Sequence, residues 1–387
     1  MTIFPRTIIA ITFAVLTINS GMAQQSRIIN GKPASTDQYP WIASLFITSE
    51  TDSETGGGCG GSLIADRWIL TAAHCFLNDE GTAVSTDAAS RTSITLGSSN
   101  INFLSGQAIV ASAARVIVHP DYNPDPDLSS NTQDFDIALV ELDATVPIAP
   151  IRLFTGSVPA NLPVIAAGWG ATAGDGSQPS DELKQTQLQT VNTQKCETAH
   201  AGSITNNMFC AGGYTDTDTS DTCQGDSGGP LFVMLGQSAL QLGITSFGGS
   251  ETANCGSPGS PGVYANISEL YGFVQEHVPT ANVLNSTASM TIAQNFYDDL
   301  TETVTIPKVY GDGLNYSVTL KHTGDLHFFL ATAEENTKDN PTAVPSYFDG
   351  VANVLILPLV KVGPDIFNVR LKHLGNYNFV VETADAP

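Results

Sequence analysis

Positively charged residues are scarce in this sequence. It holds 15 Lys and Arg against 38 Asp and Glu, which gives a formal net charge of −23 at pH 7. Such acidity disfavours contact with the phosphates of nucleic acids and with anionic membranes, so neither is expected as a partner. The shortage is most marked between Lys195 and Lys308, where neither Lys nor Arg occurs.

Charged residues of both signs are also few, at 14% of the chain, whereas glycine reaches 35 residues. This composition suits β structure with many tight turns better than long helices. Hydrophobic residues make up 42% of the 387 positions, which is enough to bury a core. The length predicts one large domain and a smaller one.

No long apolar run follows the N-terminal region. The run at residues 8–18 follows Arg6, is too short to cross a membrane comfortably, and precedes the small residues Gly21 and Ala23. This pattern predicts a signal peptide over residues 1–23, cleaved after Ala23. The mature protein is therefore expected to be secreted and soluble, without a membrane span.

Cysteines number only six. An even count in an exported chain favours disulfides over metal ligands or free thiols. Six cysteines allow 15 connectivities, so spacing alone does not select the pairs.

Short apolar runs separated by Gly, Asn, Asp and Pro predict an all-β fold over residues 28–279. The runs lie at residues 41–47, 68–72, 115–118, 137–142, 162–167 and 240–247. Residues 267–278 differ, because their apolar positions recur at helical spacing. Pro279 is expected to end that helix.

An internal repeat follows a polar linker at residues 280–302. Residues 306–333 match residues 357–384 without gaps at an offset of 51, and apolar residues alternate within each copy. Alternation indicates strands with one buried face, and each copy needs its twin to close a core. Residues 303–387 are therefore predicted to form a small all-β domain of two repeats of about 50 residues.

Three short motifs carry candidate chemistry. They are TAAHC at residues 71–75, DIAL at residues 136–139 and GDSGGP at residues 225–230. Singly, His74 could be a core residue, Asp136 a strand cap and Ser227 a turn residue. In the order His, Asp, Ser, the three motifs resemble the chymotrypsin/trypsin family of serine peptidases, over residues 28–278.

The resemblance implies a two-barrel all-β peptidase domain with a C-terminal helix, and a Ser-His-Asp triad. Ser227 would attack the scissile carbonyl, His74 would take its proton, and Asp136 would orient His74. Asp134 is a rival carboxylate, but the family pattern places the acid directly before the Ile-Ala-Leu run. The backbone N–H groups of Gly225 and Ser227 would form the oxyanion hole.

The segment RIING at residues 27–31 resembles the activation site of the family. Cleavage after Arg27 would remove a short propeptide, residues 24–27, and free the amino group of Ile28. That ammonium would pair with Asp226 and order the oxyanion loop, because a buried carboxylate without a partner is costly. Arg27 is itself acceptable to a trypsin-like enzyme, which allows self-activation.

The resemblance to the family also implies a substrate specificity. Asp221 stands where the trypsin branch places its pocket carboxylate, and Gly248 and Gly262 match the small residues of the pocket walls. Together they imply cleavage after Arg or Lys. Ser246 belongs to the strand expected to pair with the substrate backbone, and Phe247 replaces the usual tryptophan.

The absence of Lys and Arg between Lys195 and Lys308 fits an enzyme that cuts at such residues. It fits an acidic overall composition equally well. The alternative interpretation of Asp221 is one more surface acid in an acidic loop.

The family pairing of cysteines would be Cys59–Cys75, Cys196–Cys210 and Cys223–Cys255. The stretch that binds calcium in many trypsins, here residues 97–107, holds no carboxylate, so no calcium is expected there. His322 and His373 occupy equivalent repeat positions and are expected to be structural. No metal or cofactor is predicted.

The resulting hypothesis is a secreted serine endopeptidase, made as a zymogen. Its partners would be protein or peptide substrates with Arg or Lys before the cut, and proteinaceous inhibitors. The C-terminal domain would be an accessory binding or export module with an unknown ligand. The alternative is a non-catalytic binding protein on a protease scaffold, although such proteins normally lose a triad member and all three are present.

Overall fold

The structure is a computed structural model of the whole chain. It describes residues 28–284 and 296–385, except for positions 30, 105–107, 123–132, 159, 161, 178–179, 213–218, 236–237, 249–253, 299–301, 312–313, 325–326, 336–345, 350–353, 363–364 and 377. The expected signal peptide and propeptide, including Arg27, lie outside the described residues.

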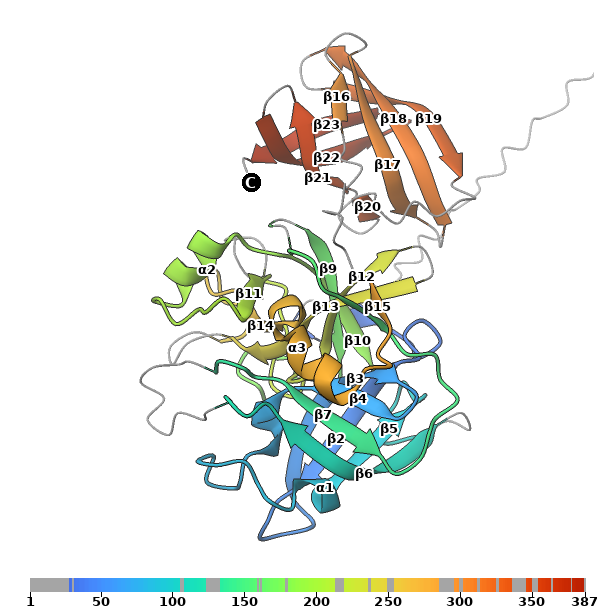
Figure 1. The fold of residues 1–387 in the computed structure, drawn as a ribbon. Helices are drawn as coiled ribbons and strands as arrows, with labels where there is room; N and C mark the ends of the chain where they lie inside the picture. The colour runs from blue at the N-terminus through green and yellow to red at the C-terminus, as the bar shows by residue number, and fades with distance from the viewer. Residues whose placement is uncertain are drawn as a thin grey trace, which may run out of the picture.

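A closed six-stranded barrel forms the first half of the peptidase region, in the order β2-β3-β4-β7-β6-β5 (Figure 1). Strands β2, β4, β6 and β7 overlap predicted apolar runs, because bulky and β-branched side chains pack into the barrel interior, whereas β3 and β5 were not predicted. The strands are β2 (Ile42–Thr48), β3 (Gly56–Ala65), β4 (Trp68–Thr71), β5 (Thr92–Leu96), β6 (Ile109–Val118) and β7 (Ala138–Leu142).

A nine-stranded sheet forms the second half, with the path β1-β10-β9-β12-β13-β14-β11; β8 also pairs with β13, and β15 pairs with β8. It is a half-barrel among the described residues, so the predicted all-β architecture of two barrel-like halves is confirmed. Its strands are β1 (Lys32–Pro33), β8 (Arg152–Phe154), β9 (Pro163–Gly168), β10 (Lys184–Gln189), β11 (Met208–Ala211), β12 (Pro230–Leu235), β13 (Ser238–Phe247), β14 (Gly262–Asn266) and β15 (Val283–Leu284).

The two halves share one hydrophobic core. Phe232 of β12 packs edge-on against Tyr39 and Trp41, with ring centroids 5.0 and 4.9 Å apart. A buried hydrogen bond, from Ser62 Oγ of β3 to Gln241 Oε1 of β13 at 2.6 Å, also crosses between them. The relative position of the halves is therefore set by close packing and by a polar contact that has no water to replace it.

Four short helical segments complete this region: η1 (Ala73–Phe76), α1 (Ala88–Arg91), α2 (Thr193–Ala199) and α3 (Ile267–His277). The helix predicted at residues 267–278 is α3. Asn266 caps it by accepting a hydrogen bond from the Ser268 backbone N–H, and Pro279 follows its end. No helix in the described part of the chain has the length and apolarity needed to span a membrane.

The three disulfides join Cys59 to Cys75, Cys196 to Cys210, and Cys223 to Cys255. This is the pairing implied by the resemblance. The bridges close loops of 16, 14 and 32 residues. In loops of this size, a disulfide stabilises the folded state by about 3 kcal/mol.

The C-terminal domain is an eight-stranded sheet in the order β16-β17-β18-β19-β23-β22-β21-β20, drawn as a separate lobe in Figure 1. Short β16 also pairs with β21, and short β20 with β17, so each repeat contributes a strand to the other. The strands are β16 (Phe296–Asp298), β17 (Thr303–Gly311), β18 (Leu314–Gly324), β19 (His327–Glu335), β20 (Ser346–Asp349), β21 (Val354–Val362), β22 (Asp365–Gly375) and β23 (Asn378–Asp385).

The repeat of the sequence is also a repeat of the structure. Strands β17 and β21 begin 51 residues apart, as do β18 and β22, and β19 and β23. Bulges recur at matching places, after Ile306 and Leu357 for example. The repeats meet where Phe328 pairs with Phe379, which are equivalent residues, so an approximate twofold axis passes through this pair.

The boundary of this domain differs from the predicted one. Strand β16 lies inside residues 280–302, the range predicted as a linker, yet it pairs with β17 and β21. A three-residue strand is too short to show alternation in a sequence. Strand β15 lies in the same range and pairs with β8 of the peptidase region.

We expect Phe328→Ala and Phe379→Ala to destabilise the C-terminal domain to a similar extent. Both side chains are at least 91% buried in one core, and truncating a buried Phe costs about 3 kcal/mol or more. Calorimetry of the full chain would measure the loss for the C-terminal transition. A large loss for one variant and none for the other would contradict the twofold arrangement.

Candidate active site

His74 lies in η1, directly after β4 of the first barrel. The disulfide between Cys59 and Cys75 ties this turn to β3. The backbone of His74 is therefore held by β4 before it and by the disulfide after it. The His74 side chain is 19% exposed, which leaves part of the ring open to solvent.

Asp136 lies immediately before β7 and its side chain is fully buried. Its carboxylate accepts two hydrogen bonds from His74, one from the backbone N–H at 2.9 Å and one involving Nδ1 at 2.7 Å. Ser246 Oγ of β13 donates a third at 2.5 Å. The carboxylate is therefore held by both halves of the peptidase region, and it orients the imidazole with Nε2 directed away from it.

The pKa values of His74 and Asp136 shift in opposite directions. Burial alone would lower the pKa of His74, but the negative charge of Asp136 and its hydrogen bond outweigh burial, so the pKa is raised above 6.5. Burial alone would raise the pKa of Asp136, but His74 and the bond from Ser246 lower it below 3.8. The arrangement favours an imidazolium beside a carboxylate, which suits a base that must hold a proton briefly.

Asp134, the rival carboxylate, is directed elsewhere. Its Oδ1 accepts hydrogen bonds from Thr205 Oγ1 at 2.9 Å and from Asn207 Nδ2 at 2.8 Å. Asp134 therefore anchors a loop of the second half, and Asp136 is the carboxylate that reaches His74.

Ser227 lies between the two halves, on a turn that fits only because glycines surround it. A Cβ at Gly228 would lie 2.1 Å from Thr71 Oγ1 and 2.6 Å from the Gly60 carbonyl oxygen. The Gly60 N–H in turn donates to the Ser227 carbonyl at 2.7 Å. The serine backbone is thus packed directly against the segment that leads into His74.

The sulfur of Cys75, the neighbour of His74, lies 3.9 Å from the Ser227 carbonyl oxygen. Among the described residues, no hydrogen bond joins Ser227 Oγ to His74. Such bonds are often long in the absence of substrate and tighten when it binds. The half-buried Ser227 is accessible for that purpose.

Gly225, the other expected oxyanion donor, lies in a turn closed by a hydrogen bond from Asp226 N–H to the Cys223 carbonyl. Its φ of 93° is in the region that favours glycine, and a Cβ there would lie 3.1 Å from Gly170 Cα. A side chain at this position would therefore be both strained and crowded.

Asp226 is buried beneath that turn. Its carboxylate accepts hydrogen bonds from the backbone N–H groups of Gly170 at 2.8 Å and Cys223 at 3.0 Å. Burial outweighs these two bonds and raises the pKa of Asp226 to about 6. Ile28, the expected new terminus, is also fully buried.

Asp221 lies at 1% exposure and accepts backbone hydrogen bonds from Thr222 at 2.8 Å and Gly256 at 3.0 Å. A Cβ at Gly262 would lie 2.8 Å from Asp221 Oδ1, so a side chain there would press against the carboxylate. A Cβ at Gly248 would lie 3.3 Å from Gly262 Cα, which places the two glycines face to face.

Two contacts at this site were not predicted from the sequence. The first is the hydrogen bond from Ser246 to Asp136, whereas Ser246 was expected only in substrate binding. The second involves His200, whose Nε2 lies 2.8 Å from the Pro261 carbonyl and whose ring meets Phe247 edge-on at 5.8 Å. His200 thereby connects the residues next to Gly248 and Gly262. No motif marks either contact, because each joins segments far apart in the chain.

Metal-binding groups are limited in the described part of the chain. Cys59, His74 and Cys75 lie close together, but both sulfurs are in a disulfide and are not free to bind a metal. The imidazoles of His322 and His373 pack on the rings of Phe328 and Phe379, at 5.3 and 5.0 Å. Those contacts fit the structural role expected for the two histidines.

Comparisons with known proteins agree with this geometry. Residues 28–274 match the family model described as Trypsin. Serine protease 1 of Rattus norvegicus is 37% identical over 224 residues, which cover 57% of this chain and 80% of that protein. Trypsin of Sus scrofa is 31% identical over 256 residues, 65% of this chain and 96% of that protein.

CLIP domain-containing serine protease B4 of Anopheles gambiae is 32% identical over 279 residues, 67% of this chain and 72% of that protein. The family match covers more than half of the chain and leaves out the C-terminal domain. The chain therefore belongs to the trypsin family, and it is a serine endopeptidase.

Proposed function

We propose that this protein is a secreted, trypsin-like endopeptidase, made as a zymogen, that hydrolyses peptide bonds after Arg or Lys. The observation that carries the proposal is the pair of half-buried His74 and buried Asp136, joined at 2.7 Å and held against the Ser227 turn. The C-terminal domain is proposed as an accessory module for binding or export.

In the proposed reaction, Ser227 Oγ attacks the carbonyl carbon of the substrate and its proton passes to Nε2 of His74. The carbonyl π electrons move to oxygen, and the N–H groups of Gly225 and Ser227 stabilise the negative charge. When the tetrahedral intermediate collapses, His74 gives the proton to the leaving amine and an acyl-enzyme remains. Water then attacks the acyl-enzyme through the same steps and releases the carboxylic acid product.

The charge of Asp136 supports the role proposed for His74. An imidazolium forms during each attack, and a fixed carboxylate at 2.7 Å stabilises it without any rearrangement. The hydrogen bond from Ser246 holds the same oxygen, Oδ2, and prevents the carboxylate from rotating away.

Specificity is proposed to come from Asp221. A buried carboxylate beside two facing glycines is suited to a long side chain that ends in a positive charge. Two backbone N–H groups orient the carboxylate, and its Oδ1 lies close to Gly262, where a side chain would be crowded.

Activation is proposed to act through Asp226. Cleavage after Arg27 would create an ammonium at Ile28, whose side chain is already buried, and this ammonium would neutralise the Asp226 carboxylate. Asp226 is the neighbour of both oxyanion donors, so its pairing would order their turn.

A serine-directed covalent probe tests the catalytic proposal. We expect labelling of Ser227 after cleavage at Arg27, and little labelling of an Arg27→Gln variant that cannot be cleaved. Ser227→Ala is the control and should remain unlabelled. Equal labelling of the cleaved and uncleaved chains would exclude activation by cleavage, and labelling at another residue would exclude Ser227 as the nucleophile.

Replacing Asp221 should remove the preference for basic residues. Leaving one buried charge without its partner typically costs 3–5 kcal/mol, so Asp221→Asn should lower kcat/KM for Arg and Lys peptides at least about 100-fold. Labelling of Ser227 by the small covalent probe, which does not need the pocket, should persist. An unchanged preference in a panel of peptides that vary the residue before the cut would refute the assignment.

The pH dependence of stability tests the role of Asp226. Its folded pKa of about 6 lies above the unfolded value of 3.8, so its contribution is fully present below pH 3.8 and is lost as pH rises through 6. The loss is on the order of 3 kcal/mol. Between pH 4 and 7, uncleaved Arg27→Gln protein should therefore lose more stability to urea than the same protein carrying Asp226→Asn.

Cleaved protein with intact Asp226 should not show this loss, because the new ammonium stabilises the ionised carboxylate. Identical pH profiles for the uncleaved chains with and without the Asp226→Asn substitution would contradict the proposal.

A further inference from the structure

Phe135, the residue before Asp136, has an unusual backbone. Its φ is 56°, in the left-handed region that a bulky side chain rarely occupies and that costs roughly 1–2 kcal/mol. The Phe135 carbonyl accepts a hydrogen bond from the Ile137 N–H at 2.7 Å, which closes a tight turn around Asp136. The conformation of Phe135 therefore sets the direction in which the Asp136 carboxylate leaves the chain.

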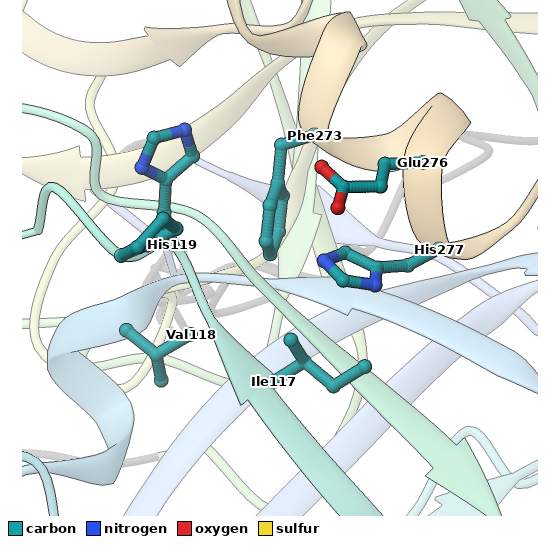
Figure 2. Close-up of a pocket in the computed structure, with 7 residues that line it drawn as sticks. Ile117, Val118, His119, Phe273, Glu276 and His277 are labelled. Carbon is teal, nitrogen blue, oxygen red and sulfur yellow. The ribbon is translucent and has the colours of Figure 1, made fainter.

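A continuous row of rings packs against Phe135. Its ring stacks on His119 at 4.7 Å with planes 22° apart, and His119 lies 4.9 Å from Phe273 of α3. Phe273 in turn meets His277 edge-on at 5.0 Å. Figure 2 shows the last three residues of the row, with the Phe273 side chain between the two imidazoles. We call Phe135, His119, Phe273 and His277 the ring row.

The ring row is well packed on its inner side. Phe273 is 6% exposed, and the His119 side chain is 13% exposed. On the outer side lies a hollow of about 380 Å³, lined by Ile117, Val118, His119, Pro120, Phe273, Glu276 and His277 (Figure 2). On the packed side, a shift of His119 would displace Phe135 or Phe273, which contact its ring.

Polar contacts also fix His119. Its ring Nδ1 accepts a hydrogen bond from the Asp121 N–H at 3.2 Å, and its backbone N–H donates to the Ile137 carbonyl at 3.1 Å. Burial lowers the pKa of His119, although Asp121 and Asp134 oppose that shift, so an uncharged ring is favoured for stacking. His119 thus holds the turn around Asp136 from its backbone and from its ring.

The energy of aromatic stacking and the backbone strain at Phe135 are of comparable size. One aromatic pair contributes about 0.5–1.5 kcal/mol beyond the area it buries, and His119 makes two such contacts, with Phe135 and with Phe273. The contact with Phe135 is comparable in size to the strain of a left-handed Phe, and the contact with Phe273 holds the His119 ring in place. Without the stack, Phe135 would be free to relax toward negative φ, and the hydrogen bonds from His74 and Ser246 alone would then hold the Asp136 carboxylate in position.

We infer that the ring row is a positioning device that holds Phe135 in the left-handed conformation and so fixes Asp136 against His74. The inference rests on the proposed catalytic role of that pair. It assigns a function to the packing of helix α3 on the first barrel, namely orientation of the catalytic carboxylate by residues that do not touch the substrate.

A matched pair of variants tests this inference in the cleaved, full-length enzyme. His119→Ala opens the row, and His119→Phe keeps a ring in place of the imidazole. We expect His119→Ala to lower kcat about 10- to 100-fold with little change in KM, the loss expected for a misplaced catalytic group. The acid limb of its pH–rate profile should move to lower pH, because a more distant Asp136 raises the pKa of His74 less. His119→Phe should retain kcat within about threefold.

Leu96→Ala is the control for simple loss of stability. Leu96 is 1% exposed in the core of the same barrel and takes no part in the ring row, so its truncation should lower the unfolding temperature without moving the acid limb. A second pair tests the backbone: Phe135→Asn should lose less activity than Phe135→Ala, because Asn tolerates a left-handed φ.

The inference would be overturned if His119→Ala kept the kcat and the pH profile of the unchanged enzyme, or if His119→Phe lost as much as His119→Ala. Failure of the proposed function would look different. In that case Asp136→Asn would leave kcat unaffected, or the unchanged enzyme would not react with the serine-directed probe.

Discussion

A buried carboxylate must be surrounded by partners, and the partners of Asp136 come from separate parts of the chain. His74 belongs to the turn after β4 of the first barrel, and Ser246, 110 residues after Asp136, belongs to β13 of the second sheet. Ionising an unpaired acid in such a place would cost several kcal/mol, so Asp136 needs both His74 and Ser246 to remain ionised. The two halves of the peptidase region are thus joined by the charge on which the proposed chemistry depends.

Glycine residues allow the main chains of the two halves to come into close contact. Ser227 belongs to the second half and His74 to the first, so they can meet only where the main chains of both halves come into contact. At Gly228 and Gly60 that contact leaves no space for a side chain, because a Cβ at Gly60 would lie 2.8 Å from Gly229 Cα. Gly228 is therefore explained by close packing between the halves and by its φ of 77°, Gly229 by the Asp226 carbonyl 2.8 Å from where its Cβ would lie, and Gly225 by its φ of 93°.

Much of the fold followed from local patterns. The apolar runs became strands, residues 267–277 became a helix that ends before Pro279 as expected, and the offset of 51 residues became an approximate twofold axis. The parts that were missed depend on contacts between distant segments. Ser246 has no local feature that distinguishes a donor to Asp136 from a residue that faces the substrate, and β16 is too short for any periodicity.

The stacking of Phe135 on His119 belongs to the same group. The sequence shows a Phe between two aspartates, but its positive φ and its contact with helix α3 exist only once both halves are assembled.

Asp136 and Asp226 show what decides the charge of a buried acid in this protein. Both are 1% exposed, and both accept hydrogen bonds from backbone N–H groups. The pKa of Asp136 is nevertheless lowered, because an imidazole and a hydroxyl add to its backbone bond, whereas burial raises the pKa of Asp226 to about 6. Two neutral donors thus do not offset the burial of Asp226, and a nearby positive charge would lower its pKa. A chain that supplies this charge only after cleavage would couple the order of the oxyanion turn to its own processing.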